Sequence, residues 1–433
     1  MEKAYMQRCL DFIEDHLMAE ITLADIAAKV GFSPFHFSRM FQGAIGLPVM
    51  AYVLKRRLLH AAFHIAQGMD AKEAALSYGF DTYAGFYKAF VRAFDKSPAT
   101  VKKHGATLPP HRIDLYKGDD CMISNERLNA VLQQWRLKDI PCVPVQYENS
   151  GFVSDTAWYV GQEYVFKATQ NLDGLKTHGS IARALAGEGM SAAVPIFASD
   201  GREYIKESEW YFYLLPRLNG KPVNSRRLME KEWAEKAYKL GSLIGRLHVV
   251  LSSHDEEIAA DDIDLLATAR DYAIPGTKAA ASMPEAFYQE YTARFSKLYP
   301  LLPKHVIHRD TNPANILMQG NEFSGFVDFE LSQRSARLYD PCCLATAILS
   351  ETFPKNTPPS YDKWFEVYQA VLRGYDSVCR LTPEEREAAM YMVFTIQMIC
   401  VAYFSQTPKF QALADVNKRM TLWLWENRDR LAF

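Results

Sequence analysis

The stretch from His305 to Asp340 constrains the fold of this chain more than any other part of the sequence. It reads HVIHRDTNPANILMQGNEFSGFVDFELSQRSARLYD. A loop containing Asp310 and Asn315 comes first, and Asp328 closes the last apolar run. The residues between them predict a β-hairpin, with strands at 316–318 and 326–327 and a turn at 319–321. Polar side chains at two strand ends are therefore expected to face one cleft.

The polar residues of this stretch have the spacing H-x-D-x-x-x-x-N, followed by D-F, in His308 to Asn315 and Asp328-Phe329. This pattern resembles the catalytic loop and metal-binding strand of kinases. The resemblance implies that Asp310 accepts the proton of an attacking hydroxyl. It also implies that Asn315 and Asp328 hold Mg²⁺, which prefers carboxylate and carbonyl oxygens. One such residue alone is more often a strand or turn cap, but four matches within about twenty residues favour the kinase interpretation.

In detail the stretch is similar to the aminoglycoside phosphotransferase and choline kinase-like family, whose later Asp-Pro or Asp-Leu step is matched by Asp340-Pro341. The resemblance implies an α+β protein kinase-like C-terminal domain. Such a domain has a small lobe with an antiparallel sheet and a large, mainly helical lobe. It also implies ATP and Mg²⁺ as cofactors and a small hydroxyl compound as acceptor.

The bulk composition fits a multidomain globular protein. A chain of 433 residues is expected to form two or three domains, and 48% apolar with 23% charged residues excludes a disordered chain. Seven cysteines without a C-x-x-C spacing indicate neither a zinc site nor a disulfide framework, which favours the cytoplasm. The acidic start lacks an apolar signal segment. The most apolar run, 388–404, contains Thr395 and Gln397, so we expect a buried helix and no membrane partner.

Residues 1–104 predict an all-α domain with a repeated helix-turn-helix. Gly31-Phe32 is followed by Phe37 and Phe41, and Gly79-Phe80 by Phe86 and Phe90. A short Ala-rich helix precedes each glycine, and a helix over 49–65 joins the copies. Together they resemble the DNA-binding domain of AraC/XylS-type transcription regulators. A connecting helix of about seventeen residues spans roughly 25 Å, so two recognition helices could enter successive major grooves, about 34 Å apart.

Double-stranded DNA is the expected partner of this domain, which is mildly basic, with thirteen Lys and Arg against ten Asp and Glu. On the first recognition helix one face, with Phe37, Met40 and Phe41, must be core. Arg39 is the best candidate for a base edge, because a guanidinium can bond guanine in bidentate fashion. We expect Lys55, Arg56 and Arg57 to touch phosphates or solvent. The residues predicted to face DNA are Phe35, Ser38, Arg39, Gln42, Tyr87 and Lys88.

Residues 105–127 read as a linker and 128–220 as the small lobe. Strands are predicted at 143–147, 156–160 and 163–167, and Lys167 matches the kinase lysine that pairs with α and β phosphates. The loop around Ser150 and Gly151 is expected to cover the phosphates, although it lacks G-x-G-x-x-G. The strand 211–215 resembles the hinge that holds adenine. Since Pro216 has no N–H, Leu214 or Leu215 is the expected contact.

The helix after Lys167 departs from the kinase pattern. Kinases pair that lysine with a glutamate on the next helix, but residues 175–185 contain none, and His178 occupies the aligned position. Either the pairing is made differently or ATP binding is impaired. The large lobe, 221–433, is expected to be mostly helical, with helices at 233–251, 364–372, 383–404 and 410–430. In it we expect His248 to be a packed structural histidine.

Three functions fit these patterns. The first is a DNA-binding transcription regulator whose C-terminal domain uses Mg-ATP to phosphorylate an amino alcohol, sugar or aminoglycoside. The second is a regulator whose kinase-like domain is catalytically silent and senses a ligand or nucleotide, since fold does not fix function. The third is an antibiotic-modifying kinase with a vestigial N-terminal segment.

Overall fold

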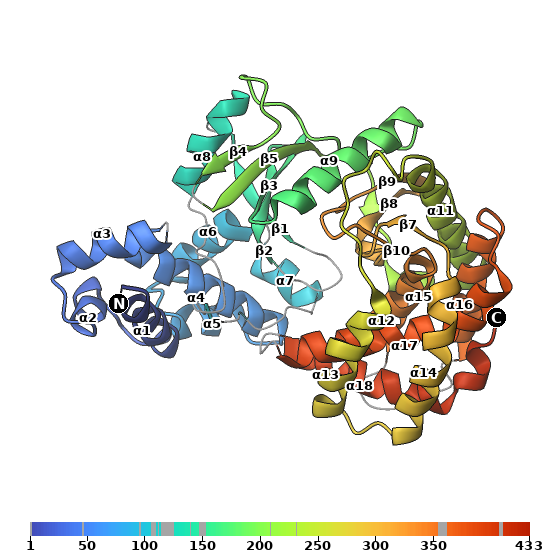
Figure 1. The fold of residues 1–433 in the computed structure, drawn as a ribbon. Coiled ribbons are helices and arrows are strands. Elements are labelled where there is room, and N and C mark those ends of the chain that lie inside the picture. The colour runs from blue at the N-terminus through green and yellow to red at the C-terminus, as the bar shows by residue number, and fades with distance from the viewer. Residues whose placement is uncertain are drawn as a thin grey trace. The chain divides into compact units, whose positions relative to one another are not determined.

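The computed structural model shows helices and strands in two compact units, Met1–Ala168 with Ile196–Arg217 and Thr169–Pro195 with Leu218–Phe433 (Figure 1). It describes residues 2–45, 47–94, 97–104, 110, 112–113, 125–138, 140–146, 153–207, 209–230, 232–353, 362–406 and 410–433.

The N-terminal domain is helical and contains both predicted helix-turn-helix motifs. Thr22 begins the second helix with a capping box shared with Asp25, and Asp70 caps the fifth. Gly31 and Gly79 close the two turns with φ of 74° and 73°, where glycine meets no Cβ penalty. The helices are α1 (Glu2–Asp15), α2 (Leu23–Ala28), α3 (Pro34–Ile45), α4 (Val49–Ala66), α5 (Ala71–Ser77), α6 (Tyr83–Phe94) and α7 (Pro98–His104).

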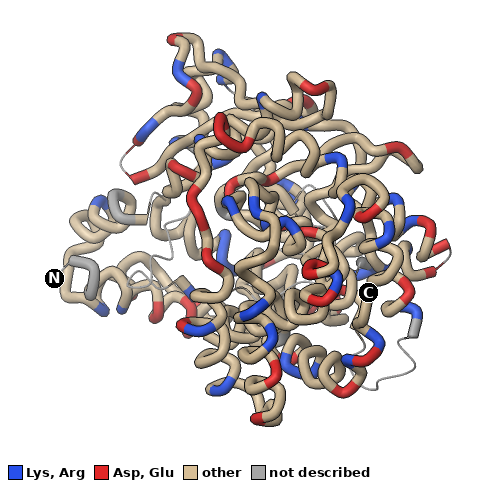
Figure 2. Tube along the Cα trace, turned by 45° about the vertical axis from the view of Figure 1, so that its right-hand side comes forward, with Lys and Arg blue, Asp and Glu red and all other residues tan. Residues whose placement is uncertain are grey.

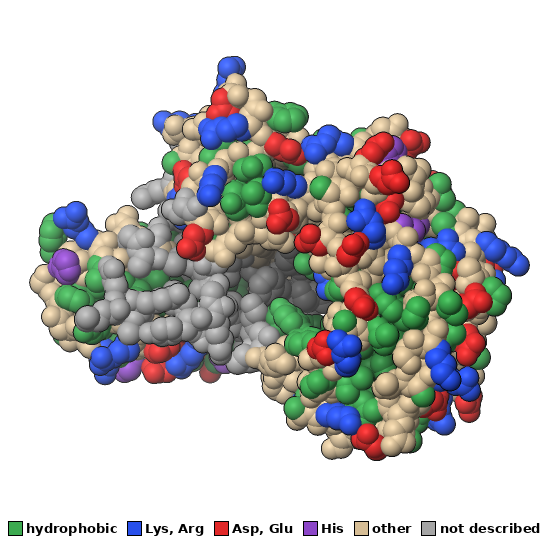
Figure 3. All heavy atoms as spheres, in the orientation of Figure 1, with side chains coloured by type: hydrophobic (Ala, Val, Ile, Leu, Met, Phe, Trp, Pro, Cys, Tyr) green, Lys and Arg blue, Asp and Glu red, His purple; other side chains and the backbone are tan. Residues whose placement is uncertain are grey.

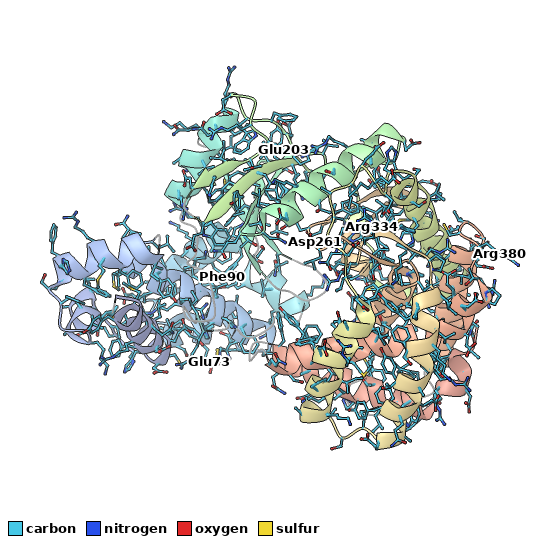
Figure 4. All side chains as sticks on the ribbon, viewed as in Figure 1. Glu73, Phe90, Glu203, Asp261, Arg334 and Arg380 are labelled. Atoms are coloured by element: carbon cyan, nitrogen blue, oxygen red, sulfur yellow. The ribbon has the colours of Figure 1, made fainter. Side chains whose placement is uncertain are left out.

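The core of this domain confirms the predicted repeat. Phe37, Phe41, Phe86 and Phe90 are fully buried in one apolar cluster with residues of α1 and α4. Figure 4 labels Phe90 on α6. Because the four phenylalanines occupy matching places in the two copies, each recognition helix has an inner face that packs and an outer face that remains accessible.

The prediction that Arg56 of α4 touches phosphates or solvent was wrong, and the neighbouring Arg57 bonds mainly within the domain. Arg56 is buried, and its Nη2 donates to Oε2 of Glu14 at 2.9 Å. Arg57 donates to the carbonyl oxygens of Leu17 at 3.0 Å and Ala19 at 2.7 Å. Both guanidinium groups therefore bond within the domain. Arg56 is a buried charge, which needs a partner, whereas Arg57 is half-buried.

The small sheet has the strand order β1-β2-β3-β5-β4, in which β1–β2, β2–β3 and β4–β5 are antiparallel. A cluster that includes Trp158, Phe166 and Phe212 forms its core with α8. The elements are α8 (Asn125–Leu132), the 3₁₀ turn η2 (Gln133–Trp135), β1 (Cys142–Gln146), β2 (Val153–Val160), β3 (Tyr164–Thr169), β4 (Ile205–Glu207) and β5 (Trp210–Pro216). The three consecutive strands predicted from the sequence are confirmed, except Tyr147, which lies outside the described residues.

The second unit has two small sheets, β6-β8-β9 and β10-β7, among many helices. The strands are β6 (Lys221–Pro222), β7 (Lys304–Ile307), β8 (Ile316–Gln319), β9 (Glu322–Phe326) and β10 (Gln333–Ala336). The helices are α9 (Leu172–Gly187), α10 (Ser225–Leu228), α11 (Trp233–Ser253), α12 (Leu265–Thr268), the π-helix η3 (Ala269–Ala273), α13 (Ile274–Ala280), α14 (Glu285–Leu298), α15 (Tyr339–Thr352), α16 (Asp362–Asp376), α17 (Pro383–Gln406) and α18 (Gln411–Glu426). Figure 2 shows acidic and basic residues interspersed along the trace.

Two anchors hold this unit together. Arg334 on β10, labelled in Figure 4, bonds the carboxylate of Asp255 at 3.1 Å, and its backbone N–H donates to the carbonyl of Asp261. The other anchor is α17, which is long and apolar enough to cross a membrane, but 67% of its apolar window is buried. It packs with α13, α14, α15 and α18, so the predicted buried helix is confirmed.

Candidate active site

The predicted base Asp310 lies in the loop between β7 and β8, held by two amides. Asn312 Nδ2 donates to Asp310 Oδ1 at 2.7 Å, and Asn315 Nδ2 donates to Oδ2 at 2.9 Å. The same Asn315 nitrogen lies 2.8 Å from the Asp310 carbonyl oxygen. A 3₁₀ turn, η5 (Pro313–Asn315), brings Asn315 back onto Asp310. These bonds fix the carboxylate of Asp310 in one orientation.

Asp328 is brought to the same place by the hairpin β8–β9. The N–H of Val327, the residue before Asp328, donates to the backbone carbonyl of Asn315 at 3.1 Å. Asp328 itself has φ of 69°, which is uncommon for a residue with a Cβ and costs about 1–3 kcal/mol. This backbone hydrogen bond between Val327 and Asn315 therefore brings the two predicted metal ligands, Asn315 and Asp328, close together.

The donor set fits Mg²⁺. The Nδ2 of Asn315 is committed to Asp310, which leaves its Oδ1 carbonyl as the atom that can meet a cation. Asp328 supplies a carboxylate, and Mg²⁺ binds with one or two carboxylates, substrate phosphates and waters. No three His, Cys, Asp or Glu side chains of the described residues come together as a metal-binding cluster. The ligands from this chain would be one carboxylate and one amide oxygen.

The electrostatic environment raises the pKa of Asp310 above the ordinary aspartate value. Burial is the largest cause, His308 opposes it, and the negative charge of Asp328 adds to it. A raised pKa strengthens a carboxylate as a proton acceptor. The effect of Asp328 also shows that the two carboxylates lie within electrostatic reach of one another.

Asp340, from the Asp-Pro step of the sequence, accepts hydrogen bonds from the backbone of the loop that contains Asp310. It is fully buried at the start of α15 and accepts the backbone N–H groups of His308 and Arg309, both at 2.8 Å. His248 Nε2 lies 2.9 Å from its Oδ2, and His248 Nδ1 lies 2.8 Å from the hydroxyl of Tyr375. Burial alone would raise the pKa of Asp340, but the bond with His248 and the nearby positive groups hold it below its usual value.

The expectation that His248 is a packed structural histidine is confirmed by its complete burial. Its contact with Asp340 places it next to the loop between β7 and β8, which spacing alone did not reveal. The sequence signal was an acidic residue inside the apolar run LYDPCCLATAI, where a buried carboxylate must be paired.

The residues predicted to bind the nucleotide belong to the small sheet. Lys167 is half-buried on β3, opposite Ala157 of β2, and its Nζ lies 6.0 Å from the ring centroid of Tyr213. Leu214 and Leu215 are buried on β5. The carbonyl of Leu214 already accepts the N–H of Ile196 at 2.8 Å. Ser150 and Gly151 lie outside the described residues.

The residues predicted to face DNA are mostly accessible. Phe35 is 76% exposed and Tyr87 41%. Arg39, Gln42 and Lys88 are also exposed, whereas Ser38 is half-buried. In Figure 3 basic and apolar side chains stand together over α3. This outer face combines a cation for base or phosphate with an aromatic ring, the side-chain types found where helices read the major groove.

Comparison with known proteins agrees with this geometry. The sequence model described as "Phosphotransferase enzyme family" matches residues 149–381, more than half of the chain. The chain belongs to the phosphotransferase enzyme family. A second model, described as "Helix-turn-helix domain", matches residues 26–104. This phosphotransferase family member therefore joins an AraC-type helix-turn-helix domain to a kinase-like domain.

Individual relatives divide between the two parts. The transcriptional regulator Rob of Salmonella typhimurium is 35% identical over 97 residues, which make up 22% of this chain and only 33% of that relative. A homoserine kinase of Sinorhizobium medicae is 25% identical over 264 residues, 56% of this chain and 71% of the kinase. The solved structure of a microcompartment-associated aminopropanol kinase aligns with a TM-score of 0.52 at 13% identity, covering 71% of this chain and 99% of that one. That likeness confirms the kinase-like fold.

Proposed function

We propose that this phosphotransferase family member transfers the γ-phosphate of ATP, with Mg²⁺, to a hydroxyl of a small molecule. We also propose that its N-terminal domain binds specific DNA sequences in the cytoplasm as a transcription regulator. The observation that carries the proposal is the hydrogen-bonded pair Asp310 and Asn315, beside which the backbone bond from Val327 to Asn315 places Asp328, while Asp340 accepts the backbone N–H of Arg309. Positioning and charge neutralisation are what phosphoryl transfer needs most.

Each residue of this group has a distinct role. Asp310 accepts the proton of the acceptor hydroxyl, and Asn315 Nδ2 keeps the accepting carboxylate in place. Asn315 Oδ1 and the Asp328 carboxylate hold Mg²⁺, which neutralises charge on the phosphates when bound. On the small sheet, Lys167 binds α and β phosphates, the loop with Ser150 and Gly151 covers them, and Leu214 or Leu215 contacts the adenine.

The acceptor class follows from the relatives' names. Homoserine and aminopropanol each carry a hydroxyl and an amino group, and two of the relatives are kinases named for them. We infer that the acceptor is a small amino alcohol, or a sugar or aminoglycoside that presents the same groups.

One observation favours a second function, in which the kinase-like domain only senses a ligand or nucleotide. Helix α9 contains no glutamate at the position where kinases pair the nucleotide lysine, and His178 stands there. A sensor should keep its signalling when Asp310 is changed to Asn, whereas an enzyme should lose transfer.

The deciding experiment is Mg²⁺-dependent transfer of labelled γ-phosphate to a panel of small hydroxyl compounds and to cell extract. Wild type is compared with Asp310→Asn, for which we expect kcat to fall about 10²–10⁴-fold with ATP still bound. A product made only by wild type supports the kinase. ATP binding without product supports the sensor, and loss of both shows that the nucleotide site is a relic.

A further inference from the structure

Helix α9 contacts the metal-binding segment Asp328–Glu330 directly through its backbone. Gly174, in the first turn of α9, lies so close that a Cβ added to it would be 2.5 Å from the carbonyl oxygen of Glu330. One helical turn later, the ring of His178 lies 5.9 Å from the ring of Phe329, measured between centroids. Positions 174 and 178 therefore form one face of the helix that rests on this segment.

His178 makes a hydrogen bond on each side of its buried ring. Its Nδ1 lies 3.4 Å from the backbone nitrogen of Phe329, and its Nε2 lies 3.0 Å from the carbonyl oxygen of Ala193. A backbone N–H can only donate and a carbonyl can only accept. Nδ1 must therefore be the acceptor and Nε2–H the donor, which defines a single neutral tautomer of the imidazole.

The hydrogen bond from Phe329 to His178 constrains the backbone next to Asp328, which has a strained conformation. Asp328 has φ of 69°, a conformation that persists only where the surroundings enforce it. On one side, His308 Nε2 donates to the carbonyl of Val327 at 3.1 Å. On the other side, the N–H of Phe329 donates to His178. The peptide groups flanking Asp328 are thus each held by a buried histidine.

Helix α9 is itself firmly attached to the same unit. The hydroxyl of Thr177 donates to the carbonyl of Ala259 at 2.6 Å, and Ile181 and Leu185 are buried in the large core of that unit. The segment after α9 adds a parallel bridge between Ala192 and Phe326, the last residue of β9. His178 therefore reaches Phe329 from a fixed support.

We propose that His178 is a positioning residue that sets the backbone of the metal-binding Asp328 through the N–H of Phe329. This inference rests on the proposed function, because the role of Asp328 as a metal ligand is part of it. It also accounts for the missing glutamate. A carboxylate at position 178 could not donate to Ala193, and it would add buried negative charge beside Asp328 and Glu330. The helix is coupled to the metal site by a neutral hydrogen bond instead.

The test measures the Mg²⁺ dissociation constant by calorimetry in the presence of ADP, using the full chain. His178→Leu keeps apolar packing but removes the acceptor. Gly174→Ala crowds the carbonyl of Glu330 and the side chain of Asn171, the N-cap of α9, without changing His178. We expect both to raise the dissociation constant about 10–100-fold, as loss of an outer-sphere partner does. His178→Asn, whose Oδ1 can replace Nδ1 as acceptor, should stay near wild type. Lys176→Ala, on the exposed side of the same helix, is the control for a substitution in α9 that leaves the contacts with Phe329 and Glu330 intact.

His178→Glu separates this inference from the ordinary kinase arrangement. If a lysine–glutamate pair were simply missing, restoring the glutamate would strengthen Mg-nucleotide binding, and that result would overturn the inference. We expect His178→Glu to weaken Mg-nucleotide binding. Long-range ¹H–¹⁵N spectra of histidine-labelled protein provide a readout without metal, because they should show His178 protonated at Nε2 only.

The failures of this inference and of the proposed function are distinguishable. Wild type that transfers phosphate, but whose Mg²⁺ affinity is unchanged by folded His178→Leu and Gly174→Ala, sinks the inference alone. Wild type without transfer, but with Mg²⁺ affinity that depends on His178, sinks the phosphotransfer proposal alone. Wild type that binds no Mg²⁺ with ADP sinks both.

Discussion

The carboxylate of Asp340 accepts the backbone N–H of Arg309 at 2.8 Å, although the two residues are 31 positions apart. Arg309, directly before Asp310 in the loop between β7 and β8, has φ of 66°, an unfavourable conformation for a residue with a Cβ. The bond to Asp340 compensates for part of this strain. The loop between β7 and β8 is therefore shaped by a buried carboxylate on α15 and not by its own sequence alone.

Asp340→Asn should disrupt the loop, because the N–H groups of His308 and Arg309 are accepted by different oxygens of the carboxylate, and an amide would replace one of these oxygens with an N–H donor that faces one of the two N–H groups. We expect a loss of about 3–5 kcal/mol in the free energy of unfolding, as for other broken buried pairs. In the folded fraction, kcat should fall more than KM rises. Thermal unfolding and steady-state kinetics check both. Asp200→Asn, which changes an exposed carboxylate paired with Arg202, is the control. Unchanged kcat in Asp340→Asn would contradict the proposed role.

Asn315 is proposed to do two things, and Asn315→Asp should separate them. The substitution keeps an oxygen ligand for Mg²⁺ but replaces the Nδ2 donor that lies 2.9 Å from Asp310 Oδ2 with a second negative oxygen. We expect Mg²⁺ affinity to be retained, while kcat falls about 10–100-fold because Asp310 is no longer oriented. Calorimetry and kinetics on the same preparation measure the two effects. A variant that loses Mg²⁺ binding and activity equally would show that Asn315 has only one role.

The local features of the site could be predicted from the sequence because they depend on neighbouring residues. The hairpin of β8 and β9, with Gly320 at φ of 64° in its turn, follows from strand and turn preferences. The closeness of Asp310 and Asn315 follows from a spacing of five residues. The repeat of phenylalanines on α3 and α6 likewise gave the core of the N-terminal domain.

Contacts between distant segments could not be predicted in this way. His178 and Phe329 are 151 positions apart, and no local pattern indicates which buried backbone group an imidazole will meet. The prediction for Arg56 failed for the same reason, as did the expectation that Arg57 has no partner within the domain. Their spacing on a helix is compatible with an exposed face. Only the tertiary fold buries Arg56 against Glu14 of α1 and brings Arg57 to the carbonyl groups of the segment after α1. The spacing of residues in one sequence predicts which of them share a face of a helix. Which segment packs against that face depends on the tertiary fold.

The buried pair of Glu14 and Arg56 predicts how the N-terminal domain responds to pH. Burial opposes ionisation of Glu14, but hydrogen bonds from His60 and Arg56 outweigh it and hold its pKa below the usual 4.5. A lowered carboxyl pKa stabilises the fold above the unfolded pKa, and this stabilisation is lost as pH falls through the folded pKa. Glu14→Gln should thus cost about 3–5 kcal/mol near neutral pH, and its difference from wild type should narrow below pH 4.5.

Hydrogen exchange of α4 amides in the full chain measures this stability for the N-terminal domain. Glu20→Gln, which changes an exposed glutamate, controls for the loss of one charge. A difference between Glu14→Gln and wild type that stays constant across the acid range would show that the ion pair does not set the pH dependence.

The two recognition helices should respond differently to loss of charge if α3 reads bases and α6 positions the DNA backbone. Arg39→Ala should weaken binding to the preferred site by about 1–3 kcal/mol and relax its sequence preference. Lys88→Ala should weaken binding to all sequences and lower the slope of log affinity against log salt by about 1. Both side chains are exposed, so neither change should affect folding. Both effects are tested by gel retardation of DNA fragments from the protein's own promoter region over a range of salt concentrations. Arg202→Ala, which removes a charge in the segment before β4, is the control. If wild type retards no fragment at low salt, the N-terminal domain is vestigial and the chain acts as a phosphotransferase alone.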